Sequence, residues 1–297
     1  MNHLILLYDS SVPSFCYYKS YGKREKMSLE TLRKVILFAQ KEGMTINVIA
    51  GGEALPEEFR KELDNILHVV IAPWTYPHDD VNDVSVVDWS PSFDASVIPD
   101  NPDKDLILRL PVQGLSALAS TVKILRFKGR RVNVTLLDVN RYREEDFKLY
   151  EQQLQALDNL GNLEINVLTD RLVLQGMNNC GAGDSSITVA PDGRLYVCPG
   201  FYYDDEDACG DIENGLCLPN RHLYRIENAP ICRICDAWQC RRCIWLNLRA
   251  TGEVNTPSRG QCVASHKERH ASVLLSAKTN TPLEDVPYED PFDTIRI

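Results

Sequence analysis

Cysteine is the residue type whose number and position in this chain indicate chemistry. The chain has ten cysteines in 297 residues, and nine of them lie between Cys180 and Cys262. Structural disulfides do not persist in a reducing compartment, so clustered thiols there usually serve metal binding or redox chemistry. The sequence therefore divides into a cysteine-poor body and a cysteine-rich module, with the boundary near residue 175.

The spacing of these cysteines is more informative than their number. Cys180 and Cys198 flank a segment that contains Pro191-Asp192-Gly193, which predicts a hairpin whose second strand delivers Cys198. A C-x2-C-x4-C-x2-C group and one later cysteine follow, at Cys232, Cys235, Cys240, Cys243 and Cys262. Four thiolates within twelve residues are difficult to satisfy without a metal.

Zinc binding and plain burial are the other interpretations of these cysteines. A zinc site of four cysteines also uses C-x2-C pairs, but the x4 gap leaves little chain to wrap around one tetrahedral ion, and at least three cysteines are left over. Single cysteines are common as small buried hydrophobic residues, which does not account for seven in this arrangement. His266 and His270 stand four apart on a predicted helix, and we expect a solvated or partly packed pair there.

The order of the cysteines resembles the SPASM domain of radical S-adenosylmethionine (radical SAM) enzymes that modify peptides. That domain has a cysteine, a Gly-x4-Cys unit, a cysteine cluster that is usually spaced slightly wider, and a final cysteine. The finer sequence is most similar to the CXXX repeat peptide maturases, which carry a SPASM domain and are associated with a cysteine-repeat precursor peptide. The matching segments are Arg233-Ile-Cys-Asp-Ala-Trp-Gln-Cys-Arg-Arg-Cys-Ile-Trp-Leu-Asn247, Glu253-Val-Asn-Thr-Pro257 and Gln261-Cys262.

This resemblance implies two 4Fe-4S clusters with interleaved ligands. Carried over residue by residue, it gives the first cluster Cys180, Cys198 and Cys243. It gives the second cluster Cys232, Cys235, Cys240 and Cys262. The first set has no evident fourth cysteine, so Cys209 or Cys217 fills the position, or the fourth iron is open to a thiolate of a substrate peptide.

The radical core of that family is degenerate in this chain. The family places C-x3-C-x2-C after its first strand, and the matching segment keeps only Cys16, with Pro13 at the middle position. One thiolate cannot hold a cubane, and proline does not replace a soft anionic ligand. We therefore expect no reductive cleavage of S-adenosylmethionine by the usual route.

A remnant of the cofactor site follows the second predicted strand. Gly51, Gly52 and Glu53 resemble the family residues that contact S-adenosylmethionine. The same residues also fit a plain strand-to-helix turn. Binding of S-adenosylmethionine without radical chemistry and a structural turn both stay open at this position.

Strands and helices alternate in the cysteine-poor body. Short apolar runs predict strands, and apolar residues at helical spacing predict helices between them. The expected strands are 4–8, 45–50, 68–72, 106–110, 132–138 and 163–168, with one extra strand at 84–88. The expected helices are 28–43, 56–65, 115–127 and 144–157. This alternation predicts parallel strands joined by right-handed crossovers.

The predicted fold class is α/β, a partial (β/α) barrel of about six units followed by a cysteine-rich iron–sulfur SPASM module. Residues 1–175 form the degenerate radical SAM-like barrel and residues 176–278 the SPASM module. Residues 279–297 form an acidic tail that runs over the surface or is partly disordered.

Composition narrows the classes of partner and compartment. The net charge is -10 and the pI is near 5.1, so a phosphate backbone is repelled and we expect no nucleic-acid partner. The apolar stretch at residues 3–8 is too short for a signal peptide, and no run approaches the length of a membrane span. We expect a cytoplasmic protein with no membrane partner.

Three functions agree with these features. The first is maturation of a ribosomally made, cysteine-rich precursor peptide, in which the clusters bind peptide or carry electrons. Two routes to the chemical step stay open: catalysis by this chain alone, or by a second maturation protein with an intact radical core. The second is a noncatalytic iron–sulfur scaffold or peptide-binding subunit. The third is a redox enzyme that uses the clusters without S-adenosylmethionine, although no nucleophile and base pair in the sequence supports catalysis by this chain alone.

Overall fold

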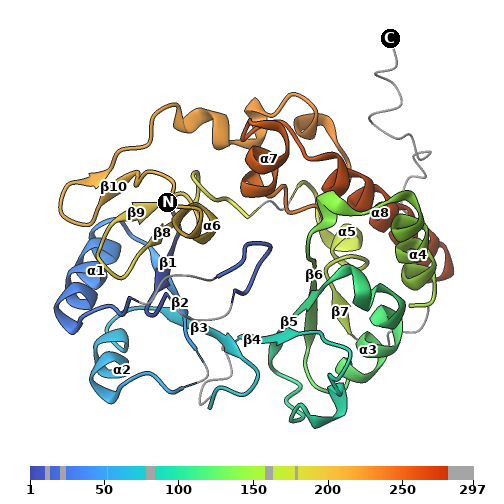
Figure 1. The fold of residues 1–297 in the computed structure, drawn as a ribbon, viewed down its shortest axis with the longest axis horizontal. Coiled ribbons are helices and arrows are strands. Elements are labelled where there is room, and N and C mark those ends of the chain that lie inside the picture. The colour runs from blue at the N-terminus through green and yellow to red at the C-terminus, as the bar shows by residue number, and fades with distance from the viewer. Residues whose placement is uncertain are drawn as a thin grey trace. The chain divides into compact units, whose positions relative to one another are not determined.

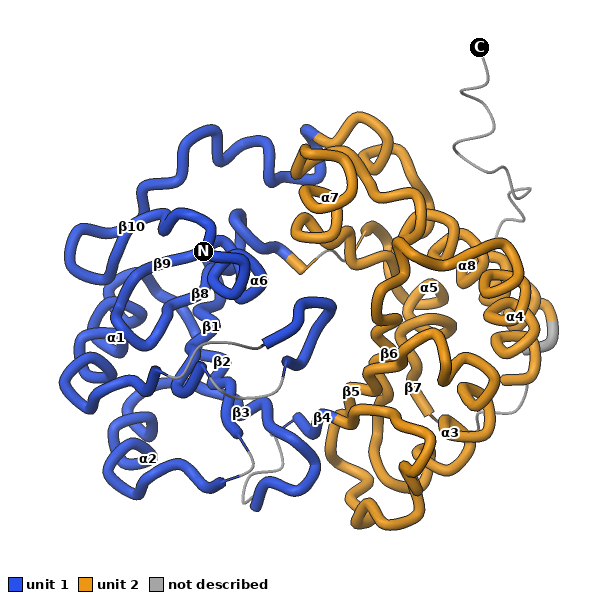
Figure 2. Tube along the Cα trace, in the orientation of Figure 1, with its two compact units in different colours: residues 1–86, 181–228 blue, residues 87–180, 229–297 orange. Residues whose placement is uncertain are grey.

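The computed structural model describes residues 1–10, 14–20, 25–51, 53–77, 84–157, 163–177 and 180–279. The chain forms two compact units, and each unit combines two separate stretches of sequence (Figure 2). The first unit contains residues 1–86 and 181–228, and the second contains residues 87–180 and 229–297. Within the ranges that are described, no helix is both long and apolar enough to cross a membrane.

The first unit is built on a mostly parallel sheet whose elements are labelled in Figure 1. Its strands pair in parallel in chain order: β1 (His3–Leu7), β2 (Thr45–Ile49), β3 (His68–Pro73) and β4 (Val84–Asp88). On the other side of β1 lie parallel β8 (Ser186–Val189) and antiparallel β9 (Leu195–Tyr196). The helices α1 (Leu29–Lys41) and α2 (Glu57–Leu63) connect β1 to β2 and β2 to β3.

Helix α1 shows why the sequence predicts these elements well. The Ser28 hydroxyl oxygen accepts a hydrogen bond from the Thr31 backbone N–H at 3.0 Å, which caps the first turn. The apolar residues of one face are buried against the sheet, at Leu32, Val35, Ile36 and Ala39. Gly43 follows the helix with a φ of 66°, the left-handed conformation that glycine adopts most easily.

The rest of the first unit consists of short elements that follow the β8–β9 hairpin. They are α6 (Pro199–Tyr203), β10 (Gly210–Asp211), β11 (Gly215–Leu216), and the 3-10 helices η4 (Arg221–Tyr224) and η5 (Ile226–Asn228). The expected hairpin between Cys180 and Cys198 is confirmed, with its turn at residues 190–194. The sequence does not predict that β8 also pairs with β1.

The second unit contains the parallel strands β5 (Asp105–Leu110), β6 (Arg131–Leu136) and β7 (Glu164–Ile165). Its longer helices are α3 (Leu118–Leu125), α4 (Glu144–Gln155), α7 (Ile244–Thr251) and α8 (Arg259–Thr279). Its shorter ones are α5 (Asp170–Val173), η1 (Ala95–Val97), η2 (Val112–Ala117), η3 (Val139–Arg141) and η6 (Cys232–Ile234). Parallel strands with intervening helices confirm the α/β class and are consistent with a partial barrel.

Two elements of the second unit differ from their expected lengths. Strand β7 has two residues, whereas the sequence predicts a strand over 163–168. The side chain of Asn166 bonds the backbone of Val134, with Oδ1 accepting at 2.7 Å and Nδ2 donating at 3.0 Å, so it takes the place of further strand pairing. The helix expected over 115–127 begins as η2 and continues as α3. The acidic tail lies beyond Thr279, outside the described residues.

Candidate metal centre

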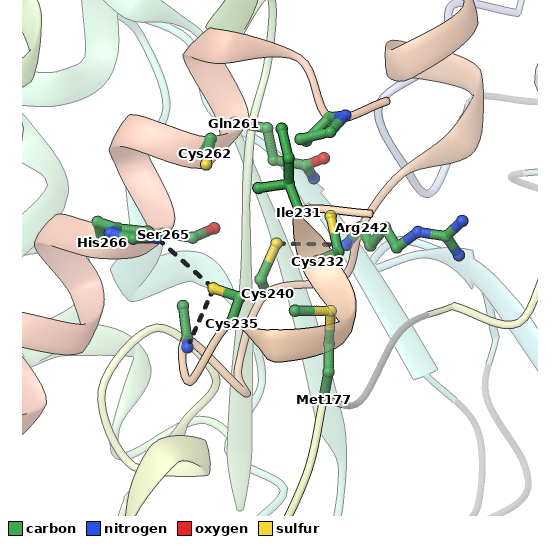
Figure 3. A pocket seen from close by; sticks show the side chains of 12 residues that line it. Met177, Ile231, Cys232, Cys235, Cys240, Arg242, Gln261, Cys262, Ser265 and His266 are labelled. Carbon is green, nitrogen blue, oxygen red and sulfur yellow. Dashed lines mark hydrogen bonds between the residues drawn. The ribbon is translucent and has the colours of Figure 1, made fainter. Parts of the chain in front are cut away.

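A small cavity in the second unit is surrounded by four cysteines (Figure 3). These are Cys232, Cys235, Cys240 and Cys262, the set that the resemblance assigns to the second cluster. Its other lining residues include Met177, Ile231, Arg242, Gln261 and His266. The cavity volume is about 20 Å³, which is room for a water molecule, so the side chains must spread to admit a cluster.

The backbone around these cysteines directs N–H groups at their sulfur atoms. The backbone N–H of Ala237 donates to Cys235 Sγ at 3.4 Å, and that of Arg242 donates to Cys240 Sγ at 3.4 Å. Arg242 has a φ of 40°, an uncommon conformation for a residue with a side chain. Hydrogen bonds of this kind stabilise thiolates and are typical around metal-bound sulfur.

Side chains of the loop at 236–239 fasten it to two helices. The Asp236 carboxylate accepts a hydrogen bond from Arg269 of α8 at 2.6 Å and forms an ion pair with Arg171 of α5 at 3.6 Å. Gln239 Nε2 donates to the Ser265 carbonyl oxygen of α8 at 2.7 Å. The loop that carries Cys235 and Cys240 is therefore fixed to α8, which also carries Cys262.

The connection between α7 and α8 is fixed by a buried asparagine in the segment that resembles the peptide maturases. Asn247 is fully buried, and its Nδ2 donates to the Val254 carbonyl oxygen at 3.1 Å while its Oδ1 accepts from the Ser258 N–H at 3.1 Å. Ser258 in turn accepts the Cys262 N–H through its carbonyl oxygen at 3.0 Å. Asn247 therefore positions the start of α8 and, through it, Cys262.

The cavity is an unfavourable place for an uncompensated thiolate. Burial raises the pKa of Cys232 to about 11 and that of Cys240 to about 12, and it also raises the pKa of Cys235. These thiols hold their protons at neutral pH in the absence of a cation. A metal ion or cluster replaces those protons when it binds, so the site favours a positively charged occupant.

The donor set at the cavity fits a soft metal. Four sulfur donors are the ligands of iron–sulfur clusters and of structural zinc. In the part of the chain that the structure describes, no three His, Cys, Asp or Glu side chains converge closely enough to hold one metal ion. The cysteines are thus grouped around one cavity without forming a closed tetrahedron.

The cysteines that the resemblance assigns to the first cluster are divided between the two units. Cys180 and Cys243 belong to the second unit, where the Cys180 N–H donates to the Arg241 carbonyl oxygen at 3.1 Å. Cys180 is exposed and Cys243 is buried. Cys198 belongs to the first unit, where it precedes α6 and is half-buried.

The two candidates for a fourth ligand, Cys209 and Cys217, lie together in the first unit. The Cys217 N–H donates to the Cys209 carbonyl oxygen at 2.7 Å, at the open end of the β10–β11 hairpin. Cys209 is buried, its Sγ donates to the Leu195 carbonyl oxygen at 3.4 Å, and burial raises its pKa to about 11. Cys217 is exposed, so it is the more accessible thiol of the pair.

The segment that matches the radical core carries no clustered ligands among its described residues. Asp9 forms an ion pair with Lys26 at 3.4 Å. Cys16 is half-buried, and its carbonyl oxygen accepts a hydrogen bond from the Ser14 hydroxyl. Gly51 is half-buried and Glu53 is exposed at the end of β2. Gly52 and Pro13 lie outside the described residues.

Two residues at the cavity were missed by sequence reasoning. His266, expected to be a solvated or partly packed residue, is 8% exposed, and its Nε2 lies 3.5 Å from Cys235 Sγ. Gln261 is 6% exposed and lines the same cavity. The available signal was helical spacing, because His266 follows Cys262 by four residues and therefore shares its helix face.

Comparisons with known proteins identify a similar fold. No protein-family model matches the chain, and no curated protein matches its sequence. The fold is similar to that of Streptococcus suis SuiB bound to precursor peptide SuiA, with a TM-score of 0.53, 13% identity, and coverage of 88% of this chain and 76% of that chain. Another Streptococcus suis SuiB structure has a TM-score of 0.48 and 10% identity, covering 86% of this chain and 76% of that one.

Proposed function

We propose that this chain takes part in the maturation of a ribosomally made, cysteine-rich precursor peptide and that its cysteines hold two auxiliary 4Fe-4S clusters. The observation that carries the proposal is the grouping of Cys232, Cys235, Cys240 and Cys262 around one cavity. The similarity in fold to SuiB bound to a precursor peptide supports a peptide partner. When bound, the clusters supply electron transfer or an iron site for a peptide thiolate.

The chain's own residues perform the binding and positioning roles in this proposal. Asp236, Arg269 and Gln239 hold the cysteine loop against α8. The buried cavity would keep water away from the cluster proposed at Cys232, Cys235, Cys240 and Cys262, and would so strengthen hydrogen bonds to its sulfurs. Cys180 is the exposed member of the first set and so its most accessible proposed ligand.

The chemical step is assigned to a partner. Because the segment around Cys16 lacks the other two cysteines of C-x3-C-x2-C, no reductive cleavage of S-adenosylmethionine is proposed for this chain. A second maturation protein with an intact radical core supplies that reaction in the cytoplasm, while this chain presents the peptide. Gly51, Gly52 and Glu53 are retained as a remnant S-adenosylmethionine site.

A noncatalytic iron–sulfur brace is the second candidate, and one observation favours it. Cys235 and Cys240 flank the loop and Cys262 lies on α8, so a cluster there would cross-link the loop to the helix, beside the ion pairs of Asp236. In this case the metal contributes stability rather than peptide recognition.

The test compares peptide binding with folding after anaerobic reconstitution with iron and sulfide. The probe is a synthetic peptide of repeated Cys-Xaa-Xaa-Xaa units, and its matched control has serine at every cysteine. We expect the reconstituted chain to prefer the cysteine peptide in fluorescence anisotropy, and the iron-depleted chain to lose this preference while its circular dichroism spectrum is retained. Equal binding of both peptides would sink the maturation proposal, and unfolding upon iron removal would favour the brace.

A further inference from the structure

Gln261 contacts both sets of proposed cluster ligands. It hydrogen-bonds the backbone of Cys243, which belongs to the first set, and it lines the cavity formed by the second set. Its side chain is 6% exposed and lines the cavity beside Cys262 (Figure 3). Its Oε1 accepts the backbone N–H of Cys243 at 3.0 Å. Because that backbone group can only donate, the atom that faces it must be the amide oxygen, and the position of Nε2 is thereby fixed.

The Nε2 group of Gln261 is buried, and it has no hydrogen-bond partner among the residues that the structure describes. Buried N–H groups in native proteins almost always have an acceptor, so this donor indicates a partner that belongs in the cavity. The cavity is lined by four cysteine sulfurs, which accept hydrogen bonds once they are thiolates. A charged acceptor of this kind also forms the stronger type of hydrogen bond.

We propose that Gln261 is a positioning residue that donates an N–H···S hydrogen bond to the cluster held at Cys232, Cys235, Cys240 and Cys262, while its carbonyl oxygen fixes Cys243 of the other set. This inference rests on the proposed cluster binding and adds a residue that sets the reduction potential. A hydrogen bond to cluster sulfur stabilises the extra negative charge of the reduced state, which raises the potential. The one side chain thus couples the two ligand sets.

The variant Gln261→Met tests this role because methionine has similar volume and no N–H. Gln153→Met is the matched control, since Gln153 is a glutamine of the same unit whose Oε1 also accepts a backbone N–H, from Ala119 at 3.1 Å, and it does not line the cavity. Both variants lose a hydrogen bond to a backbone N–H, and only Gln261→Met loses the proposed contact with sulfur.

The measurement is an anaerobic redox titration followed by EPR, with iron and sulfide counted in each sample. We expect Gln261→Met to keep its iron and to shift the potential of one cluster downward, with no shift in Gln153→Met. Unchanged potentials in Gln261→Met at full iron content would overturn the role of Gln261 while leaving cluster binding intact. A native chain without iron would overturn both, and the iron count distinguishes the two failures.

A measurement on the native chain covers the case in which Gln261→Met loses its cluster. Pulsed EPR of protein labelled with nitrogen isotope at the glutamine side chains should detect coupling between the reduced cluster and one glutamine nitrogen. The same coupling is expected in Gln153→Met. Its absence from the native spectrum would overturn the proposed hydrogen bond.

Discussion

Glu268 is a buried carboxyl group on the face of α8 that holds the cysteine loop. It accepts a hydrogen bond from the Tyr150 hydroxyl of α4 at 2.8 Å and a longer one from Gln239 Nε2 at 3.4 Å. Burial raises the pKa of Glu268 from 4.5 to about 7, and the nearby Asp170 adds to this increase. The charged form is thus disfavoured in the folded chain.

The raised pKa of Glu268 predicts a defined dependence of stability on pH. Between pH 4.5 and about 7 the folded chain binds more protons at this group than the unfolded chain, so the free energy of unfolding falls as the pH rises through this window. Glu268→Gln keeps an acceptor for Tyr150 and has no charge to bury. We expect its advantage over the native chain to grow across the window towards about 3 kcal/mol.

Urea unfolding on either side of that window measures this difference. Glu151→Gln is a suitable control, because its carboxylate on α4 is only partly buried and pairs with Lys267 at 2.8 Å. If the free energy of unfolding depended on pH in the same way in the native chain and in Glu268→Gln, this carboxyl group would not be desolvated in the folded state.

The start of α8 determines where Cys262, His266 and Gln261 lie relative to the cysteine loop. Gly260, in its first turn, lies directly against the carbonyl group of Val139 in η3. A Cβ atom at this position would overlap the Val139 carbonyl oxygen. Glycine is therefore required here by close packing of two backbones.

We expect Gly260→Ala to displace the start of α8 and to lower the free energy of unfolding by about 1–3 kcal/mol, the usual cost of overpacking. Gly176→Ala is the matched control in the same unit, because a Cβ atom there meets no atom within 4 Å. Denaturant unfolding of the two variants beside the native chain checks the difference. If both alanines had the same effect, close packing at Gly260 would not explain the glycine.

The sequence predicts those elements whose signals are local. Helix α1 follows from the Ser28 cap, its apolar face and Gly43, and the β8–β9 hairpin follows from Pro191-Asp192-Gly193 between two strands. Strand β7 is shorter than predicted because the side chain of Asn166 bonds the backbone of Val134. A hydrophobic pattern does not reveal that a side chain takes the place of backbone pairing. Local signals therefore predict whether an element is present better than they predict its length.

At the scale of the whole molecule, the features that the sequence leaves open are those that join distant residues. The pairing of β8 with β1 joins residues 186–189 to residues 3–6, and each unit combines two distant stretches of chain. Gln261 and His266 line the cavity because the fold buries them beside cysteines of another loop, which the sequence does not show. The ligand roles of the seven cysteines stay a prediction, supported by the grouping of four of them around one cavity.

The measurement that tests the iron–sulfur proposal most directly is anaerobic quantitation of iron, sulfide and zinc in the native chain. The Cys232→Ser, Cys240→Ser double variant removes two proposed ligands of the second cluster, and Cys16→Ser serves as the control. We predict about eight irons per native chain, the content of two cubanes, about half of that in the double variant, and no loss in the control. Zinc in place of iron, or an unchanged iron content in the double variant, would contradict the proposal.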